Sequence, residues 1–241
     1  MPRQRNSTRD DVDISQRLVP LSPSGRGTAS EQVYDMLRTA ILSTALTPGM
    51  AMSEADIAEN LHVSRTPVRE AFRRLAAEGL LAVSPQVGTV VKKMSRATLA
   101  DALFIRESIE CAAARLAAKA PLAAREHVRD LLQRQREAVL RGDVEGGLLR
   151  DGDLHRALID LSGHSAAWEP VRQARAHMER VRRMAVPELQ GNTKALEQHE
   201  RIVAALIAGD PDVLAEELRA HIRLIEGFVE DIASRYPDYF E

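Results

Sequence analysis

The stretch of residues 53–91 constrains the fold of this chain more than any other. Its sequence, SEADIAENLHVSRTPVREAFRRLAAEGLLAVSPQVGTVV, predicts a helix, a tight turn, a second helix and then a two-stranded wing. Ser53 and Ser64 stand where helix N-caps are expected, and Gly79 stands where the second helix should end. The expected strands, residues 80–83 and 89–91, flank a turn that contains a proline. This pattern predicts a winged helix-turn-helix domain.

The second helix of this stretch has two different faces. Val68, Phe72 and Leu75 recur at helical spacing, so we expect them in the core. An arginine row usually forms a solvated surface. Here it coincides with the turn, the caps and the wing, and a short helix with such a row fits the major groove of DNA. The outward arginines are Arg65, Arg69 and Arg73.

The charge of the chain is unevenly distributed. The formal net charge is -2, which argues against a globally basic nucleic-acid coat. Between Arg65 and Lys93, however, six basic residues stand against two acidic ones. A local basic patch on a near-neutral protein is what site-directed DNA binding requires.

The segment from about Glu31 to Val91 resembles the GntR-type bacterial transcription regulators. The motifs that carry the resemblance are VYDMLRTAILSTALTPGMAMSE, VSRTPVREAFRRL, EGLL and QVGTVV. In such proteins the start of the recognition helix and the wing contact DNA, and some relatives have a basic residue where this chain has Ala55. The resemblance implies DNA contacts from Ser64, Arg65, Thr66, Arg69, Arg73 and Gly88.

The rest of the chain suggests three parts. Residues 1–27 are rich in Arg, Ser, Pro and Asp without helical periodicity, and we expect a mobile arm whose arginines lie near DNA or in solvent. Residues 28–94 form the winged domain, beginning with a helix over residues 30–46. Residues 95–241 read as helical throughout, and glycines and prolines delimit six or seven helices. The expected fold is therefore mainly α, a winged helix-turn-helix domain followed by an all-α antiparallel bundle.

Ionisable residues occupy the apolar stripes of that bundle. Asp151 and His155 share a helix face with Leu148, while His199 and His221 lie on the apolar faces of two other helices. Burying these groups without partners would cost several kcal/mol. A divalent metal would satisfy all four, and an ordinary buried polar network is the equal alternative.

The helical part is similar to the effector (FCD) domain of the FadR-like branch of these regulators. The similar motifs are RESIECAAARLAA, DGDLHRALIDLSGH and EQHERIVAALIAGDPDVLAEELRAHI. Many members bind a divalent metal such as Zn, Ni, Mn or Fe through one aspartate and three histidines. The resemblance implies the metal ligands Asp151, His155, His199 and His221, whereas His164 stands where members commonly have Asn.

Two arginines are candidate ligands of an effector. Arg106 lies on an apolar stripe, and it either clamps a carboxylate or pairs internally with Glu110 four residues later. It resembles the arginine that lies beside the ligand cavity in such domains. Arg175 borders the stripe of the Trp168 helix, where several further arginines should be solvated. The single cysteine, Cys111, is expected to be a small buried residue.

These patterns together predict a ligand-responsive transcription regulator, and more specifically a repressor. We expect a homodimer on a palindromic operator in double-stranded DNA, controlled by a small organic acid. The alternative is an enzyme, a metal-dependent hydrolase or lyase fused to a DNA-binding module. No apolar run approaches the roughly 20 residues of a membrane span, and the N-terminus lacks the apolar segment of a signal peptide, so we expect a cytoplasmic protein.

Overall fold

The computed structural model describes Leu18 and residues 27–84, 88–185 and 193–241. The chain divides into two compact units, Met1–Lys92 and Lys93–Glu241. The expected mobile arm, residues 1–27, lies outside the described residues apart from Leu18 and Gly27. The tip of the wing, residues 85–87, also lies outside them.

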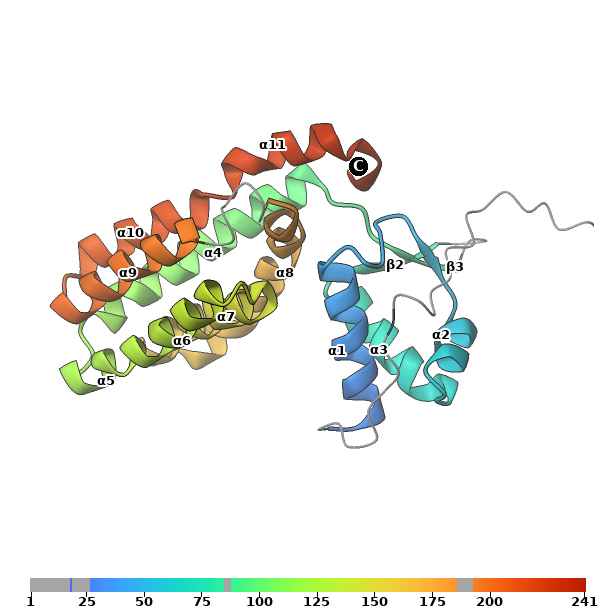
Figure 1. Ribbon diagram of the computed structural model, residues 1–241, viewed down its shortest axis with the longest axis horizontal. Helices are drawn as coiled ribbons and strands as arrows, with labels where there is room; N and C mark the ends of the chain where they lie inside the picture. Colours follow the sequence, from blue (N-terminus) through green and yellow to red (C-terminus); the bar gives the residue numbers. More distant parts are fainter. Residues whose placement is uncertain (1–17, 19–26, 85–87, 186–192) are drawn as a thin grey trace, which may run out of the picture. The chain divides into compact units, whose positions relative to one another are not determined.

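The described residues of the N-terminal unit form three helices and a small sheet (Figure 1). The helices are α1 (Ala29–Leu42), α2 (Glu54–Asn60) and α3 (Arg65–Ala77). The strands are β1 (Ala51–Met52), β2 (Leu81–Ser84) and β3 (Gly88–Val91), arranged antiparallel in the order β1-β3-β2. Strand β1 joins the predicted two-stranded wing by pairing Ala51 with Val90. A strand of two residues is too short to give an alternating pattern, which is why the sequence did not indicate it.

Helix α1 begins and ends for identifiable reasons. Thr28 and Glu31 form a capping box at its start, where each side chain satisfies a backbone amide. The helix ends at Leu42, earlier than the expected residue 46, because Thr44 adopts a positive φ of 59°. Leu46 then folds back into the core and donates its amide hydrogen bond to the Ala40 carbonyl at 2.9 Å. The apolar Leu46 had suggested a longer helix, but Leu46 lies in the turn after α1 and packs into the core from there.

The turn between α2 and α3 is tight. His62 has a φ of 53°, and the amide of Val63 reaches back to the Ala58 carbonyl at 3.0 Å. Ser53 caps α2 by accepting hydrogen bonds from the amides of Ala55 and Asp56. Ser64 occupies the N-cap position of α3, but its side chain makes no capping hydrogen bond.

The C-terminal unit is helical (Figure 1). Its described residues form eight α-helices, more than the expected six or seven, because the five-residue α5 is separate and because α10 and α11 are distinct. No glycine or proline marks the break between α10 and α11 at residues 224–225. The helices are α4 (Arg96–Ala117), α5 (Leu122–Glu126), α6 (Val128–Leu140), α7 (Val144–Leu161), α8 (Trp168–Ala185), α9 (Thr193–Ala208), α10 (Pro211–Arg223) and α11 (Glu226–Arg235).

The long helix α4 organises this unit by packing against α7, α8 and α10. Its alanines at positions 114 and 117 are fully buried, and such small side chains let neighbouring helices approach closely. Leucines and isoleucines from α7, α9 and α10 complete the core beside them. Within the described parts of the chain, no helix is both long and apolar enough to cross a membrane.

Candidate metal centre and nucleic-acid interface

Helix α3 presents the two faces that its sequence predicts. Val68, Phe72 and Leu75 are buried, and Val68 and Leu75 are completely so. The predicted DNA-contacting residues are all exposed: Ser64, Arg65, Thr66, Arg69, Arg73 and Gly88. Arg65, Arg69 and Arg73 recur at four-residue spacing along the exposed side of α3, and Gly88 stands at the start of the wing strand β3.

The arginines of α3 differ in what they contact. Arg69 donates from Nε to the Glu54 carboxylate at 3.1 Å, and both side chains are solvent-accessible. Arg74, one position away from the row, lies with its guanidinium 3.7 Å from the centre of the Tyr34 ring. Arg74 therefore contacts α1 through Tyr34, although its side chain is exposed like those of the row.

Four potential metal ligands from three helices converge inside the C-terminal unit. Asp151 and His155 come from α7, His199 from α9 and His221 from α10, and all four are buried. Each offers one ligand atom, and these atoms lie within 4.8 Å of one another. The His221 Nε2 atom lies 3.2 Å from Nε2 of His155 and 3.2 Å from Nε2 of His199. Two ligands of one tetrahedral zinc ion stand roughly 3.3 Å apart when each lies about 2.0–2.1 Å from the metal.

The outer nitrogen of each imidazole is held by an oxygen acceptor. His155 Nδ1 contacts the Glu110 carboxylate, His199 Nδ1 lies 2.7 Å from Gln135 Oε1, and His221 Nδ1 lies 3.1 Å from Gln198 Oε1. An Nδ1 hydrogen donated outward leaves the Nε2 lone pair directed inward. The three lone pairs then face one another, an arrangement that a cation between them would stabilise.

Burial keeps these histidines neutral. Loss of solvation lowers the pKa of His199 to about 3 and lowers the pKa of both His155 and His221. Burial alone would raise the pKa of Asp151, but Arg182 and Arg175 outweigh it and hold that pKa well below its usual range. Neutral imidazoles beside an ionised carboxylate are the protonation states that bind a divalent ion.

Two arginines of α8 reach the Asp151 carboxylate. Arg175 Nη2 lies 2.5 Å from Oδ2, and Arg182 donates from Nη1 to Oδ2 at 2.7 Å and from Nη2 to Oδ1 at 2.6 Å. The sequence singled out Arg175 but expected most of the other arginines of α8 to be solvated. That expectation was wrong: Arg182 and Arg183 are largely covered, and Arg180 is buried.

Arg106 forms the internal pair that was one of the two roles expected for it. It is buried on α4 and donates from Nε to Glu110 Oε1 at 2.6 Å, so the internal pair forms. Its Nη2 atom, however, has no hydrogen-bond partner among the described residues, and the same holds for Arg175 Nη1. A small cavity of about 30 Å³ borders Arg106, Arg182 and His221.

Sequence reasoning missed the groups that surround the candidate ligands. Glu110 and Gln135 hold the imidazoles of His155 and His199, and both are almost completely buried. The sequence signal that could have identified Glu110 and Gln135 is their position on the apolar face of an amphipathic helix. His164, by contrast, is exposed at the start of a short 3₁₀ turn, and Cys111 is buried as expected. Burial raises the pKa of the Cys111 thiol to about 11.

Comparison with known proteins gives a consistent result for both units. The model of bacterial regulatory proteins of the gntR family matches residues 29–91, and the FCD domain model matches residues 101–224. A helix-turn-helix transcriptional regulator from an unstable DNA locus of Streptomyces ambofaciens is 36% identical over 88% of this chain and 90% of the relative. The transcriptional repressor RspR of Escherichia coli is 32% identical over 95% of this chain and 99% of the relative.

A solved structure shares the architecture. The structure of E. coli McbR/YncC superimposes with a TM-score of 0.69 at 25% sequence identity, covering 88% of this chain and 99% of that one. Together with the winged α3 region and the helical unit, these similarities identify the chain as a transcription regulator of the GntR family, in the FadR-like branch that carries an FCD domain.

Proposed function

We propose that this regulator is a repressor that binds a palindromic operator as a homodimer and responds to a small carboxylate through a metal site. Regulators of this family bind DNA, and RspR, which aligns over nearly the whole chain, is named a repressor. The proposed DNA contacts come from the exposed side of α3 and from Gly88 at the wing. Paired recognition helices reading two half-sites give such short motifs their affinity.

The inward-facing Nε2 atoms are the observation that carries the metal proposal. Asp151, His155, His199 and His221 would hold one divalent ion, whose positive charge would attract an anionic oxygen. The donor set of three imidazoles and one carboxylate suits Zn, Ni, Mn or Fe. Glu110, Gln135 and Gln198 would orient the imidazoles from outside.

The balance of buried charge favours an anionic effector. Around the cluster, the guanidinium groups of Arg106, Arg175 and Arg182 stand against the carboxylates of Glu110 and Asp151, which leaves an excess of positive charge. A bound divalent ion would increase that excess, and burying uncompensated charge is costly. A carboxylate would neutralise part of it and would accept hydrogen bonds from the unpartnered Arg106 Nη2 and Arg175 Nη1.

The proposed switch follows from the small size of the cavity. A space of about 30 Å³ beside Arg106 and Arg182 holds only about two water molecules, so an organic acid requires rearrangement of the surrounding helices. Arg175 and Arg182 both lie on α8, and both donate hydrogen bonds to the Asp151 carboxylate. An anion that attracts these two side chains would therefore displace α8. We propose that the resulting population shift reaches the DNA-binding unit through residues 94–98.

Metal analysis of the full chain tests the metal proposal. We expect about one divalent ion per chain in the wild type, a sharp loss in His199→Ala and wild-type content in His164→Ala, because His164 is exposed outside the cluster. Both variants remove one imidazole, so they form a matched pair. Equal metal content in wild type and His199→Ala would refute the site.

Fluorescence tests the effector. Trp168 is the only tryptophan, and its ring lies 6.0 Å from the Arg175 guanidinium, so a ligand at Arg175 should change the emission. Screening hydroxy, keto and sugar acids should identify a ligand whose response disappears on chelation and whose affinity falls at least about tenfold in Arg106→Ala. The ligand should be recovered unchanged; turnover would favour the metal-dependent hydrolase or lyase. A neutral effector that binds equally well without metal would contradict the carboxylate proposal.

A further inference from the structure

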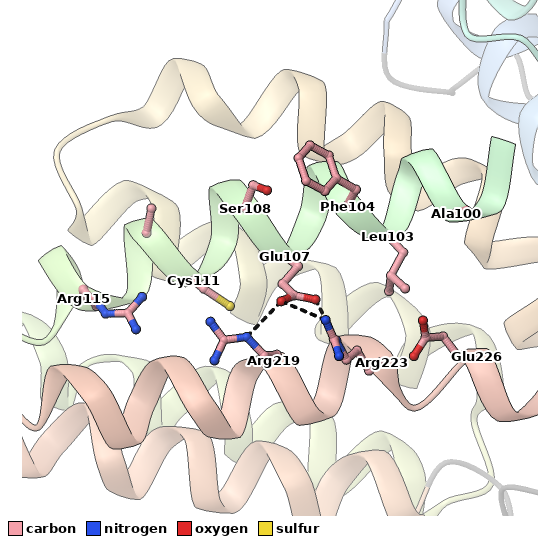
Figure 2. Close-up of a pocket in the computed structure, with 11 residues that line it drawn as sticks. Ala100, Leu103, Phe104, Glu107, Ser108, Cys111, Arg115, Arg219, Arg223 and Glu226 are labelled. Carbon is pink, nitrogen blue, oxygen red and sulfur yellow. Dashed lines mark hydrogen bonds and ion pairs between the residues drawn. The ribbon is translucent and has the colours of Figure 1, made fainter. Parts of the chain in front are cut away.

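Helix α4 exposes an apolar residue beside a groove. Phe104 is 73% exposed although it lies within a 22-residue helix. Next to it, a groove of about 580 Å³ runs between α4 and the α10–α11 segment. Figure 2 shows Phe104 and Ser108 projecting from the same side of α4, while Glu107 points to Arg219 and Arg223 on α10. A single exposed phenylalanine needs no explanation, so the surroundings of Phe104 decide what it implies.

The exposed row of α4 is self-complementary. Its members follow one another at steps of three or four residues, and the steps are the same in both directions from Ser108, so all lie on one helix face. Phe104 on one side of Ser108 corresponds to Ala112 on the other, and Asp101 corresponds to Arg115. The row comprises Asp101, Phe104, Ser108, Ala112 and Arg115, all within α4.

A two-fold axis at Ser108 would use this complementarity. In an antiparallel pair of α4 helices, each residue shares a layer with the residue equally far from Ser108 on the other helix. The bulky Phe104 would then lie beside the small Ala112 of the second copy, and the acidic Asp101 would lie beside the basic Arg115. An isologous interface requires this relation, in which one surface complements itself.

The groove supplies a hole for the exposed ring. In knobs-into-holes packing, a side chain enters the space between four residues at positions i, i+3, i+4 and i+7 of the facing helix. At Ala112 these four are Ser108, Cys111, Ala112 and Arg115, all of which line the groove. Three of them are small, so the hole has room for a phenyl ring.

Ion pairs keep the side of the groove in place. Glu107 accepts from Arg219 Nε at 2.9 Å and from Arg223 Nε at 2.7 Å, which ties α4 to α10 (Figure 2). Arg115 Nε lies 3.2 Å from Asp212 at the start of α10, with 43% of its side chain exposed. The hole is therefore shaped within one chain, and the Arg115 guanidinium remains accessible to an acid from outside.

We propose that the Asp101–Arg115 row of α4 is the surface on which a second copy of this chain docks, antiparallel and centred on Ser108, with Phe104 of each copy seated between Ser108, Cys111, Ala112 and Arg115 of the other. The inference rests on the proposed homodimer and adds its surface and register. It involves the C-terminal unit alone.

Sedimentation of the full-length protein tests the surface. We expect the wild type to be a dimer and Phe104→Glu to raise its dissociation constant at least about 100-fold, because both copies lose a buried aromatic anchor. Metal content and helical circular dichroism should not change. The control is Arg201→Asp, which breaks an exposed α9–α10 ion pair, 3.0 Å between Nε and Glu217 Oε2, away from the α4 row.

Charge exchange tests the register. Asp101→Arg and Arg115→Asp should each weaken the dimer, because each places like charges together twice across the axis. The double variant restores opposite charges across the axis and should dimerise more tightly than Arg115→Asp alone, because the loss of the Arg115–Asp212 pair is common to both. A double variant weaker than either single variant would rule out the register.

Cross-linking tests the position of the axis without depending on the stability of a charged variant. Ser108→Cys should form a disulfide-linked dimer under oxidation, because the two residues meet at the axis. Ala112→Cys is one turn away, and its symmetry mate is displaced by about 12 Å along the helices, so it should not cross-link. Wild type controls for the buried Cys111.

The outcomes separate the two levels of the proposal. A dimer that survives Phe104→Glu, together with absent Ser108 cross-linking, would overturn this surface and leave the homodimer intact. A wild-type monomer at micromolar concentration would overturn both.

Discussion

The two units of this regulator place their charged side chains in opposite environments. On α3, Arg65, Arg69 and Arg73 face solvent beside a fully apolar inner side. In the helical unit, Arg106 and Asp151 lie inside, where loss of solvation must be offset by partners. Exposed charged residues can be substituted without affecting the core. Their side chains also remain available to bind a polyanion. Buried charges are part of the core, so altering them affects stability and binding together.

Among its described residues, the N-terminal unit also buries one carboxylate, and its surroundings differ from those of the cluster around Asp151. Glu78 accepts from the Tyr34 hydroxyl and from Arg38 Nε at 3.1 Å, so its charge is balanced by hydrogen bonds to the neighbouring helix. The cluster around Asp151 differs because its imidazole nitrogens converge on one another, and because two guanidinium atoms nearby remain unpartnered among the described residues. These inward lone pairs and unpartnered donors are the features on which the proposed ligand site rests.

The largest expected effect is at the most buried charge. Asp151→Ala should lower the free energy of unfolding by about 3–5 kcal/mol, because it leaves Arg175 and Arg182 without their shared carboxylate. Urea denaturation with a chelator present measures this apart from metal affinity. The matched control is Glu230→Ala, which removes an exposed partner of Arg96 and should leave the midpoint unchanged. An equal loss of unfolding free energy in the two variants would show that the contribution of these carboxylates to stability does not depend on their burial.

Acidification should destabilise the helical unit well before its carboxylates titrate. The folded state holds the pKa of His199 at about 3, while the unfolded chain has an ordinary histidine pKa near 6.5. The unfolded state therefore binds more protons below pH 6.5, and stability falls as the pH is lowered. Between pH 7 and pH 5, His199 should contribute a loss of about 2 kcal/mol.

The variant His199→Gln isolates this contribution. Its unfolding free energy in chelator should depend less on pH than that of the wild type over the same range. An unchanged slope would mean that His199 is protonated in the folded protein.

On the exposed side, substitutions should affect DNA binding while leaving stability almost unchanged. Arg69→Ala should weaken operator binding by about 1–3 kcal/mol if the side chain makes a bidentate guanine contact. Arg74→Ala should weaken it less, because its guanidinium lies over Tyr34. Titration of labelled operator at two salt concentrations measures both, and binding should fall steeply with salt. Wild-type binding by Arg65→Ala, Arg69→Ala and Arg73→Ala alike would remove α3 from the interface.

The smallest expected effect is the difference between two serines that both occupy helix N-cap positions. Ser53→Ala should cost about 0.5–2 kcal/mol of stability, because its hydroxyl oxygen accepts from two amides at the start of α2. Ser64→Ala should cost less, because its side chain makes no capping hydrogen bond, and it should instead affect operator binding. Thermal unfolding and operator titration of both variants would show whether Ser64 contributes to DNA binding rather than to stability.

Much of the fold could be predicted because its determinants are local. The alternation of Val68, Phe72 and Leu75 with outward arginines predicted α3 and its two faces. Gly79 and the helix-capping residues placed the start of the wing. The predicted end of α1 was wrong, because the positive φ of Thr44 and the return of Leu46 to the core depend on packing across the unit.

The candidate site divides in the same way. The sequence marked Asp151, His155, His199 and His221 because an ionisable residue on an apolar stripe is visible in one helix at a time. It did not reveal Arg182 or Gln135, because a long polar side chain near the edge of a helix points inward only when another helix covers it. Burial of such a side chain depends on how two helices pack together, so the sequence of one helix does not show it.

The sequence by itself determined the helix periodicity, the capping residues, the arginine row and the four candidate metal ligands, since each follows from side chains on one element. Only the tertiary structure decided that the candidate ligands of α7, α9 and α10 meet within 4.8 Å, that each imidazole is held by an outer oxygen, and that α8 turns two arginines onto Asp151. The physical reason is that distances between helices depend on how their surfaces pack, and packing is a property of several segments at once.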